Sequence, residues 1–167
     1  MKLRVKKLHK DAVLPKYAHK GDSGFDLYAV EDIIIYPNET KKIPIGLAFD
    51  IPEGYEMQIR PRSGVTSKTK LRVQLGTVDS GYKGEVMVMV DNIANPFSYD
   101  DSSGLLFAID GTVVDTNFHV NNAYLIQKGD RIAQGIIAPV IAAEIEETDD
   151  VGTSERGSGG FGSTGIK

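Results

Sequence analysis

The stretch Ile43-Pro44-Ile45-Gly46-Leu47-Ala48-Phe49-Asp50-Ile51 decides the fold class, because a large apolar side chain stands at every second position. A period of two places one face of a β-strand in the core. The same period resumes after the turn Pro52-Glu53-Gly54, where Tyr55, Met57 and Ile59 alternate with polar residues. We therefore expect one strand across Ile43–Ile51 and another directly after the turn.

Further segments repeat this alternation on both sides of the opening stretch. Val86, Val88 and Val90 alternate with Met87 and Met89, so we expect that strand to be covered on both faces. Glycine, proline, asparagine and aspartate separate the runs at short intervals, which is typical of a β-barrel or β-sandwich. One short helix is expected after Ser63, and 142–147 fits helix or strand. Other expected strands are Leu71, Val73 and Leu75, and the runs Leu3–Leu8, Ile33–Tyr36 and Ile136–Ile141.

Composition limits the classes of function. The chain has 167 residues, a net charge of −4, no cysteine and three widely spaced histidines. One domain with a sizeable core is expected, while disulfides, thiolate metal sites and a histidine zinc site are not. The acidic balance argues against general nucleic-acid binding, and no apolar run is long enough for a signal peptide or a membrane span. A cytoplasmic protein is the expectation.

Two regions depart from the alternating pattern. Residues 93–122 are polar and irregular around a small apolar patch at Leu105, Leu106, Phe107 and Ile109, which indicates an insertion between two core strands. Residues 153–165 are rich in glycine and serine and contain a single aromatic residue, Phe161. Such a composition cannot build a core. We therefore predict a β-rich core over 1–152, including the insertion, and a flexible C-terminal arm over 153–167.

Two polar segments lie before the middle of the chain. Asp26, within Gly24-Phe25-Asp26-Leu27-Tyr28-Ala29, fits either a turn aspartate or the coordination shell of a magnesium ion. In Arg60-Pro61-Arg62-Ser63-Gly64, an arginine and a serine meet an expected helix start, a combination that suits phosphate. The alternative is a serine that caps the helix beside a surface arginine.

A third segment, Leu75-Gly76-Thr77-Val78-Asp79-Ser80-Gly81-Tyr82-Lys83-Gly84-Glu85, indicates a β-hairpin between two apolar strands. Its backbone amides could approach a planar base, and Tyr82 could pack against a sugar. Asp79 is the best general-base candidate in the chain, although an aspartate in such a turn commonly satisfies local N–H groups.

The last two segments are Gly129-Asp130-Arg131-Ile132-Ala133-Gln134 and the arm from Arg156 to Gly165. Asp130 and Arg131 are expected to form a structural pair, and Gln134 could reach a ligand. Gly157–Gly162 match the spacing G-x-G-x-x-G, yet the dinucleotide motif needs a following helix, and the chain ends too soon for one. The arm could instead close over a base and its phosphates, or be disordered.

Taken together, the five segments resemble, in order and spacing, the motifs of the trimeric dUTPase family. Gly24–Ala29, Pro61–Gly64, Gly76–Gly84, Gly129–Gln134 and Arg156–Gly165 correspond to motifs one to five. The resemblance implies an all-β, jelly-roll-like homotrimer in which each active site is built from three chains. It also implies Mg²⁺-dependent hydrolysis of dUTP to dUMP and pyrophosphate, which limits uracil in DNA.

The resemblance also implies roles for single residues. Asp79 would activate the attacking water, Tyr82 would pack under deoxyribose, and Asp26 would hold magnesium through bound water. Uracil would be read near Leu75 and Gly76, with Gln74 in place of a frequent family asparagine. The remaining substrate-binding residues would be Arg62, Ser63, Gly64, Thr77, Gln134, Arg156, Phe161, Gly162, Ser163 and Thr164.

The insertion at 93–122 resembles, in its placement, the extra segment of some bacteriophage dUTPases, where that segment takes part in binding regulatory proteins. The resemblance covers the placement and leaves a regulatory partner at 93–122 as one option. Two other functions stay open. A dCTP deaminase shares the fold but attacks the base, and it would convert dCTP to dUTP. A regulatory binding protein would work through the insertion alone or beside catalysis, and its partner would need residues 93–122.

Overall fold

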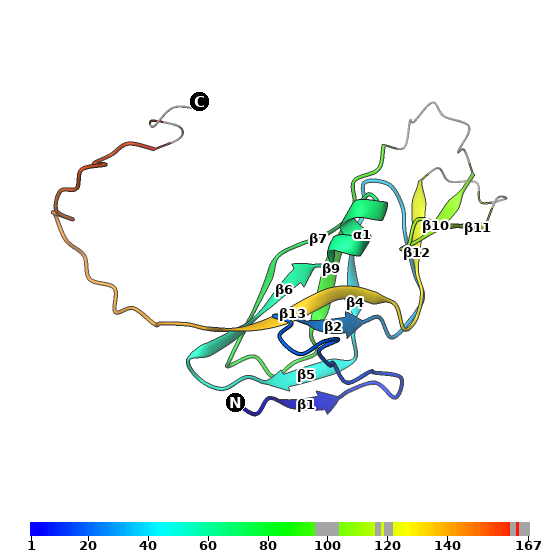
Figure 1. The fold of residues 1–167 in the computed structure, drawn as a ribbon, viewed down its shortest axis with the longest axis horizontal. Coiled ribbons are helices and arrows are strands. Elements are labelled where there is room, and N and C mark those ends of the chain that lie inside the picture. Colours follow the sequence, from blue (N-terminus) through cyan, green and yellow to red (C-terminus); the bar gives the residue numbers. More distant parts are fainter. Residues whose placement is uncertain (96–103, 116–117, 119–121, 161–162, 164–167) are drawn as a thin grey trace.

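The computed structural model describes residues 1–95, 104–115, 118, 122–160 and 163 of the chain. Almost all of its regular structure is β-strand, as the period of two predicts, and one short helix, α1 (Ser63–Lys68), lies where it was expected (Figure 1). The strands are β1 (Arg4–Lys7), β2 (Phe25–Tyr28), β3 (Ile33–Ile35), β4 (Thr40–Pro44), β5 (Leu47–Asp50), β6 (Tyr55–Pro61), β7 (Leu71–Val73), β8 (Gly76–Asp79), β9 (Met87–Asn92), β10 (Leu106–Ala108), β11 (Val113–Asp115), β12 (Ala123–Ile126) and β13 (Arg131–Pro139).

The stretch Ile43–Ile51 forms two strands, so the expectation of one strand was wrong. All five of its alternating apolar residues are buried. The chain nevertheless breaks at Gly46, whose φ of +65° is a left-handed conformation that favours glycine. The break lets β4 pair with β9 and lets β5 pair with β1 in another sheet. The alternation continues through the corner because both strands face the same core.

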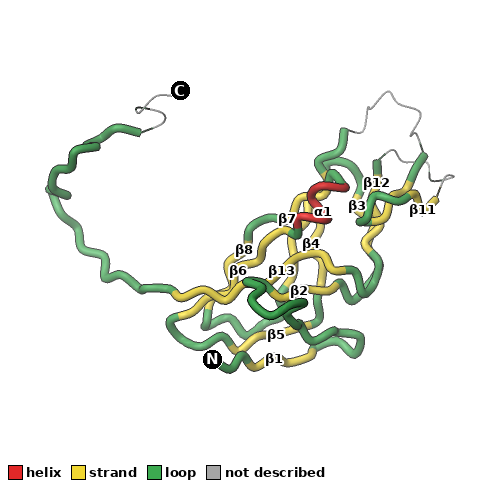
Figure 2. The backbone as a smooth tube through the Cα atoms, viewed as in Figure 1, coloured by secondary structure: helices red, strands yellow, loops and turns green. Residues whose placement is uncertain are grey.

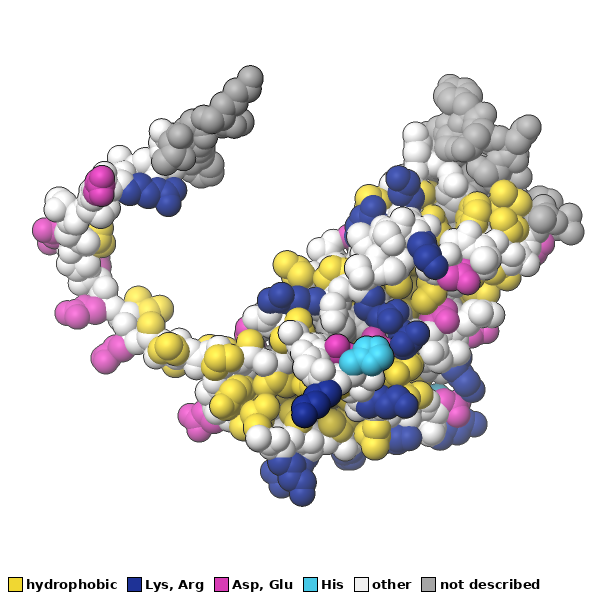
Figure 3. Space-filling model, viewed as in Figure 1, with side chains coloured by type: hydrophobic (Ala, Val, Ile, Leu, Met, Phe, Trp, Pro, Cys, Tyr) yellow, Lys and Arg dark blue, Asp and Glu magenta, His cyan; other side chains and the backbone are white. Residues whose placement is uncertain are grey.

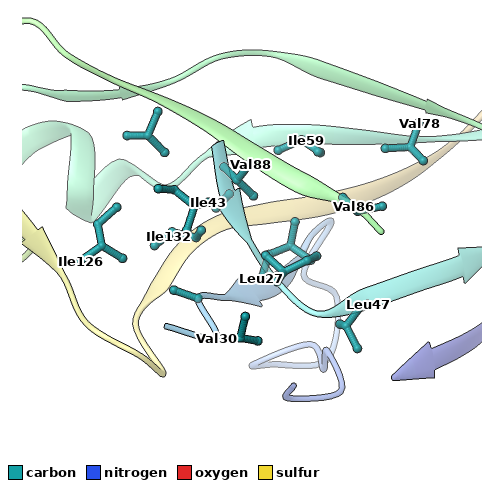
Figure 4. Close-up of a cluster of buried hydrophobic side chains, with 14 of the residues drawn as sticks. Leu27, Val30, Ile43, Leu47, Ile59, Val78, Val86, Val88, Ile126 and Ile132 are labelled. Atoms are coloured by element: carbon teal, nitrogen blue, oxygen red, sulfur yellow. The ribbon is translucent and has the colours of Figure 1, made fainter. Parts of the chain in front are cut away.

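The core lies between two main sheets. One has the order β2-β13-β6-β8 and the other the order β4-β9-β7. Figure 4 shows side chains from both sheets in one cluster, with Ile59 and Ile132 from the first and Ile43 and Val88 from the second. Each of these four side chains is at most 5% exposed, so the two sheets exclude water from the space between them.

The segment between β8 and β9 is not a β-hairpin, which corrects the sequence interpretation. β8 pairs with β6, whereas β9 pairs with β4 and β7, so the chain crosses from one sheet to the other between Asp79 and Met87. We call residues 79–86 the inter-sheet turn. The glycines and the flanking apolar runs suggested a hairpin because a local pattern does not specify which strand each edge pairs with.

Two expectations about coverage were also wrong within the protomer. Met87 and Met89 are 42% and 41% exposed, so only the valine face of β9 is covered. Leu75 lies beyond the end of β7 and is 75% exposed, whereas Leu71 is buried. A face that is apolar in sequence and exposed in one chain is available for contact with another molecule.

The described part of 93–122 is more regular than its polarity suggested. Strands β10 and β11 extend a sheet of order β11-β10-β12-β3, in which β10 runs parallel to β12. Leu106 is buried, and Phe107 and Ile109 pack against the core. The apolar patch therefore attaches the insertion to the body. The rest of the insertion, residues 96–103, 116–117 and 119–121, lies outside the described residues.

After β13 the chain leaves the two sheets, and its described part has no regular secondary structure (Figure 2). The prediction of helix or strand over 142–147 was therefore wrong. Acidic side chains follow one another along this segment, away from the body in Figure 3. Among the described residues, no helix has the length and apolar character needed to span a membrane.

Candidate functional site

The first candidate site is a cavity of about 310 Å³ that gathers residues from the first, second and fourth motif segments. Asp26 comes from β2, Gln134 from the neighbouring β13, and Arg62 and Ser63 from the junction between β6 and α1. We call this space the Asp26 cavity. Its lining residues are Ala18, Asp22, Ser23, Gly24, Asp26, Arg62, Ser63, Gly64, Arg131 and Gln134.

Asp26 holds two guanidinium groups in the Asp26 cavity. Its Oδ1 lies 2.8 Å from Arg62 Nε, and its Oδ2 lies 3.2 Å from Arg131 Nη1. The Asp26 side chain is only 14% exposed, so this carboxylate is partly withdrawn from water. Each guanidinium has more donors than these contacts use, so the cluster of one carboxylate and two guanidinium groups is net positive and presents N–H groups to the cavity, whose lining also includes Asp22. Such an arrangement suits an anion.

Gln134 is fixed beside these arginines. Its Nε2 donates to the main-chain oxygen of Pro61 at 2.9 Å. Its Oε1 lies where a Cβ on Gly24 would stand, only 2.5 Å away, so residue 24 must lack a side chain for Gln134 to keep this place. The pairing of Gln134 with Asp26 across the two strands brings the first and fourth motif segments together.

The expected pairing of Asp130 with Arg131 does not occur. Arg131 reaches Asp26, whereas the Asp130 carboxylate accepts a hydrogen bond from the Gln127 N–H at 2.8 Å. Burial raises the pKa of Asp130 above its ordinary value, and the Gln127 hydrogen bond opposes that shift. Arg131 is the first residue of β13, whereas Asp130 belongs to the turn before it, so the two side chains meet different neighbours.

α1 begins directly after Arg62, and this position corrects the capping alternative. Arg62 occupies the N-cap position with extended backbone angles, and the N-cap makes no side-chain hydrogen bond. Ser63 is the first residue of the helix instead. Its hydroxyl is therefore not used as the helix cap, and it lines the Asp26 cavity.

The second candidate site is a cavity of about 380 Å³ at the inter-sheet turn, which we call the Asp79 cavity. Asp79 stands at the end of β8, and Tyr82 follows in the turn, with its N–H donating to the Asp79 carbonyl at 3.0 Å. Apolar side chains line the cavity beside this exposed carboxylate. The lining residues are Lys42, Ile59, Gly76, Thr77, Val78, Asp79, Tyr82, Glu85, Val86, Met87 and Met89.

β8 is an edge strand of its sheet. It pairs with β6 on one side, and in the described part of the chain no strand pairs with its other side. The free edge leaves outward-facing main-chain N–H and C=O groups of 76–78 available for hydrogen bonds, whereas the Asp79 carbonyl already accepts one from Tyr82. Together with the apolar wall of the Asp79 cavity, these groups can bind a planar heterocycle that is apolar on its faces and polar on its edges.

The two cavities lie on opposite edges of one sheet. Asp26 is on β2 and Asp79 is on β8, with β13 and β6 between them. Three strand spacings of about 4.8 Å give roughly 14 Å across the sheet. Asp79 lies opposite Glu56 of β6. Asp26 lies opposite Gln134 of β13, and Gln134 lies opposite Arg60 of β6. The offset of four residues between Glu56 and Arg60 adds about 13 Å along the strands. A single nucleotide cannot place one phosphate chain at both carboxylates of the same protomer.

Several predicted site residues lie outside both cavities. The Gln74 side chain donates through Nε2 to Asp91 on β9, and Leu75 lines a neighbouring cavity with Gly76 and Thr77. On the arm, Arg156 donates through Nε to the main-chain oxygen of Gly159 at 2.8 Å, and Ser163 is exposed. Phe161, Gly162 and Thr164 lie outside the described residues.

Two residues for which the sequence predicted no role border the predicted site. Glu85 lines the Asp79 cavity, and Glu56 is the cross-strand neighbour of Asp79. Neither could have been found from spacing alone, because Glu56 reaches Asp79 through strand pairing and Glu85 through a turn between sheets. The alternation of β6 does place Glu56 on the face opposite to the core.

The described residues contain no group of three or more histidine, cysteine, aspartate or glutamate side chains that could hold a metal ion. Asp26 is the carboxylate that both arginines of its cavity contact. Magnesium commonly keeps several waters and is held by one or two carboxylates together with phosphate oxygens of a substrate. A single partly buried carboxylate beside an anion-binding cluster fits that way of binding, and it does not fit a complete protein cage.

Comparisons with known proteins agree over nearly the whole chain. A family model described as dUTPase matches residues 10–102 and 111–165. The chain is 45% identical over 167 residues to the deoxyuridine 5′-triphosphate nucleotidohydrolase of Nautilia profundicola, an alignment that covers 99% of each protein.

The fold of the chain is also similar to that of solved dUTPase structures. A mutant dUTPase of Staphylococcus bacteriophage 80alpha with dUpNHpp superimposes with a TM-score of 0.91 at 35% identity, over 99% of both chains. A mutant dUTPase from phage phi11 of S. aureus, described with a structural Mg(II) ion, superimposes with a TM-score of 0.83 at 32% identity, over 92% of this chain and 100% of that one. These similarities confirm the expected all-β fold.

Proposed function

The chain belongs to the dUTPase family, and we propose that it hydrolyses dUTP to dUMP and pyrophosphate at a site shared between the chains of a homotrimer. The observation that carries the proposal is the separation of the Asp79 cavity from the Asp26 cavity across one sheet. One cavity suits a nucleoside and the other suits phosphates. A second copy can bring its own Asp26 cavity next to Asp79, so a homotrimer with shared sites supplies both halves to one dUTP.

The nucleoside half rests on the Asp79 cavity. The free edge of β8 near Gly76 and Thr77 offers main-chain groups to the edges of uracil, and the Tyr82 ring packs against deoxyribose. Asp79 is exposed at the end of β8 and takes a proton from a water molecule. The oxygen of that water forms the new bond to the α-phosphorus, and the bond to the bridging oxygen breaks so that pyrophosphate leaves.

The phosphate half rests on the Asp26 cavity of the neighbouring copy. Arg62 and Arg131, held by one carboxylate, direct their remaining N–H groups to the phosphate oxygens, and Ser63 and Gln134 add neutral hydrogen-bonding groups. Phosphoryl transfer depends mainly on positioning and on neutralising charge. Asp26 would hold Mg²⁺ through bound water, and the ion would align and neutralise the phosphate chain.

The C-terminal arm would complete the site. Arg156, Phe161 and the pair Ser163-Thr164 would close over the base and the γ-phosphate, with Gly162 allowing the close approach. The arm carries few apolar residues and is largely exposed where it is described, so it has little to hold it against its own protomer. Closure upon a complete triphosphate would exclude bulk water during hydrolysis.

A direct assay separates this function from its alternatives. We expect purified protein with Mg²⁺ to release pyrophosphate from dUTP, far more slowly from dTTP, dCTP and UTP, and only weakly when a chelator removes the metal. Formation of dUTP from dCTP would instead identify a deaminase. The absence of turnover with every nucleotide would leave the regulatory binding protein as the function.

The insertion supports a second proposed role, the binding of a regulatory protein. Its described strands β10 and β11 lie at the edge of a sheet beside β12, apart from both cavities. A partner bound there need not occupy the substrate site. A partner that binds the whole chain, but not a chain that lacks 93–122, would support the role; equal binding to both would exclude it.

A further inference from the structure

Tyr82 is held in one orientation by a hydrogen bond within the inter-sheet turn. Its hydroxyl donates to the main-chain oxygen of Glu85 at 2.9 Å, although the residue is 48% exposed. The ring lies over Gly84, where an added Cβ would stand 2.6 Å from the Tyr82 hydroxyl oxygen. The ring can occupy this place only because residue 84 has no side chain, and the Glu85 carbonyl then fixes its tip.

Hydrogen bonds on both sides of the Glu85 carbonyl hold it close to the start of β5. On one side of it, the Glu85 Oε1 accepts a hydrogen bond from the Gly46 N–H at 2.9 Å. On the other side, the Val86 N–H donates to the Leu47 carbonyl at 2.9 Å. These two hydrogen bonds are made with Gly46 and Leu47, consecutive residues of the corner between β4 and β5. The peptide whose carbonyl accepts the Tyr82 hydrogen bond is therefore held at two points.

The corner that receives these bonds is closely packed. Gly46 has a φ of +65°, and a Cβ there would stand 2.7 Å from His9 Cβ and 3.0 Å from both Ala12 Cβ and Val30 Cγ1. Gly46 therefore cannot move far without disturbing the core. The hydrogen bond from Gly46 to Glu85 therefore restricts the movement of the inter-sheet turn relative to the core.

The other side-chain anchor of the turn is weaker. Lys83 Nζ donates to the Ser80 carbonyl at 2.8 Å and to Asp50 Oδ1 at 2.7 Å. The Lys83 hydrogen bond, together with Arg4, holds the pKa of Asp50 below its ordinary value. The Lys83 and Asp50 side chains are 54% and 40% exposed, however, and exposed ion pairs contribute little to stability. Of the two side chains, Glu85 is thus the stronger anchor.

We infer that Glu85 is a positioning residue that sets the discrimination against a 2′-hydroxyl, because its side chain anchors the peptide that orients the Tyr82 ring. The inference rests on the proposed function, in which that ring packs against deoxyribose. dUTP and UTP differ by one hydroxyl group, so a small retreat of the ring is enough to admit the ribonucleotide. Loss of the Glu85 anchor should thus affect the choice of sugar more than the chemical step.

The test compares Glu85→Ala, Glu85→Gln and the matched control Lys83→Met in the full-length chain. The measurement is kcat/KM for dUTP and for UTP, with far-UV circular dichroism to verify folding. We expect the ratio of kcat/KM for dUTP to kcat/KM for UTP to fall about tenfold in Glu85→Ala, which corresponds to about 1.4 kcal/mol. The fall should come mainly from a lower KM for UTP, because the retreat of the ring admits the ribonucleotide. Glu85→Gln keeps an acceptor for the Gly46 N–H and should stay close to the wild-type ratio, as should Lys83→Met.

An unchanged ratio in folded Glu85→Ala would overturn the inference, and so would a Glu85→Gln variant that falls as far as Glu85→Ala. If Glu85→Ala does not fold, Tyr82→Phe provides the test instead, because it removes only the hydroxyl that donates a hydrogen bond to the Glu85 carbonyl. We expect the ratio to fall in Tyr82→Phe, and an unchanged ratio would refute the role. If the wild-type protein does not hydrolyse dUTP, both the proposed function and this inference are overturned. If the wild-type protein hydrolyses dUTP and the variants keep its dUTP-to-UTP ratio, this inference alone is overturned.

Discussion

Arg62 donates through Nη1 to the main-chain oxygen of Arg131 at 3.1 Å, and both guanidinium groups contact the carboxylate of Asp26. The two arginines are far apart in the sequence and belong to different motif segments. Their joint contact with one carboxylate fixes the spacing of two cations before any substrate arrives. Fixed charges of this kind need little reorganisation when negative charge is transferred between phosphate oxygens.

Asp79→Asn tests the general base. The amide cannot accept the proton of the attacking water, so we expect kcat to fall by about 10²- to 10⁴-fold. The exposed position of Asp79 at the end of β8 indicates little cost to stability. Steady-state turnover, with binding of a non-hydrolysable dUTP analogue as the control, measures the two effects separately. Near-normal turnover would remove Asp79 from the mechanism.

Motif order predicted several residues of the Asp26 cavity, whereas the pattern of strands did not predict how the strands connect. Asp26, Arg62, Ser63, Gly64 and Gln134 do meet in one cavity. Period two predicted β4, β5, β6 and β9, because alternating burial is a local property. It did not predict the break at Gly46 or the crossing of the chain after Asp79, because strand partners are chosen by long-range packing.

The sequence also did not predict the contacts that depend on which strands pair and in which register. Arg131 reaches Asp26 because β13 pairs with β2 with a local irregularity, and Glu85 reaches Gly46 because the turn crosses between sheets. Leu75 follows the alternation and yet is exposed, since β7 ends at Val73. The roles of Arg156, Phe161, Gly162, Ser163 and Thr164 remain predictions that depend on substrate.

Removal of residues 156–167 tests the arm. The truncated chain keeps the strands of the body, so we expect an unchanged oligomeric state and unchanged thermal unfolding. Hydrolysis of dUTP should fall by about 10²-fold or more, because the site no longer closes over the triphosphate. Light scattering and pyrophosphate release provide the two readouts, and full activity without the arm would refute its closing role.

Gly135→Ala tests the packing beside Gln134. A Cβ at residue 135 would stand 2.5 Å from Phe25 Cε2 and 3.1 Å from Met57 Sδ, both in the core. Overpacking of this kind lowers the free energy of unfolding by about 1–3 kcal/mol. Gly81→Ala is the matched control, because no atom beyond the two adjacent residues lies within 4 Å of the added Cβ. Chemical denaturation should separate the two variants, and equal stability would contradict the packing described.

Asp130→Asn tests the effect of burial on pH dependence. The folded-state pKa of Asp130 is raised above 3.8, mainly by burial, so folding favours its protonated form. Its favourable contribution is complete below pH 3.8 and is lost as the pH rises through the raised folded-state pKa. We expect Asp130→Asn to gain stability over wild type across that rise. A difference in unfolding free energy that does not vary between acidic and neutral pH would contradict this assignment.

The shared site is tested most directly by mixing two inactive variants, Asp79→Asn and Arg62→Ala, after unfolding and refolding them together in equal amounts. If each site takes Asp79 from one copy and Arg62 from another, about a quarter of the sites in randomly assembled oligomers combine two intact halves. We predict that pyrophosphate release from dUTP recovers to about that fraction of the wild-type rate. Mixed oligomers, verified by differently tagged chains, that remain as inactive as either variant alone would show that each protomer carries its own complete site.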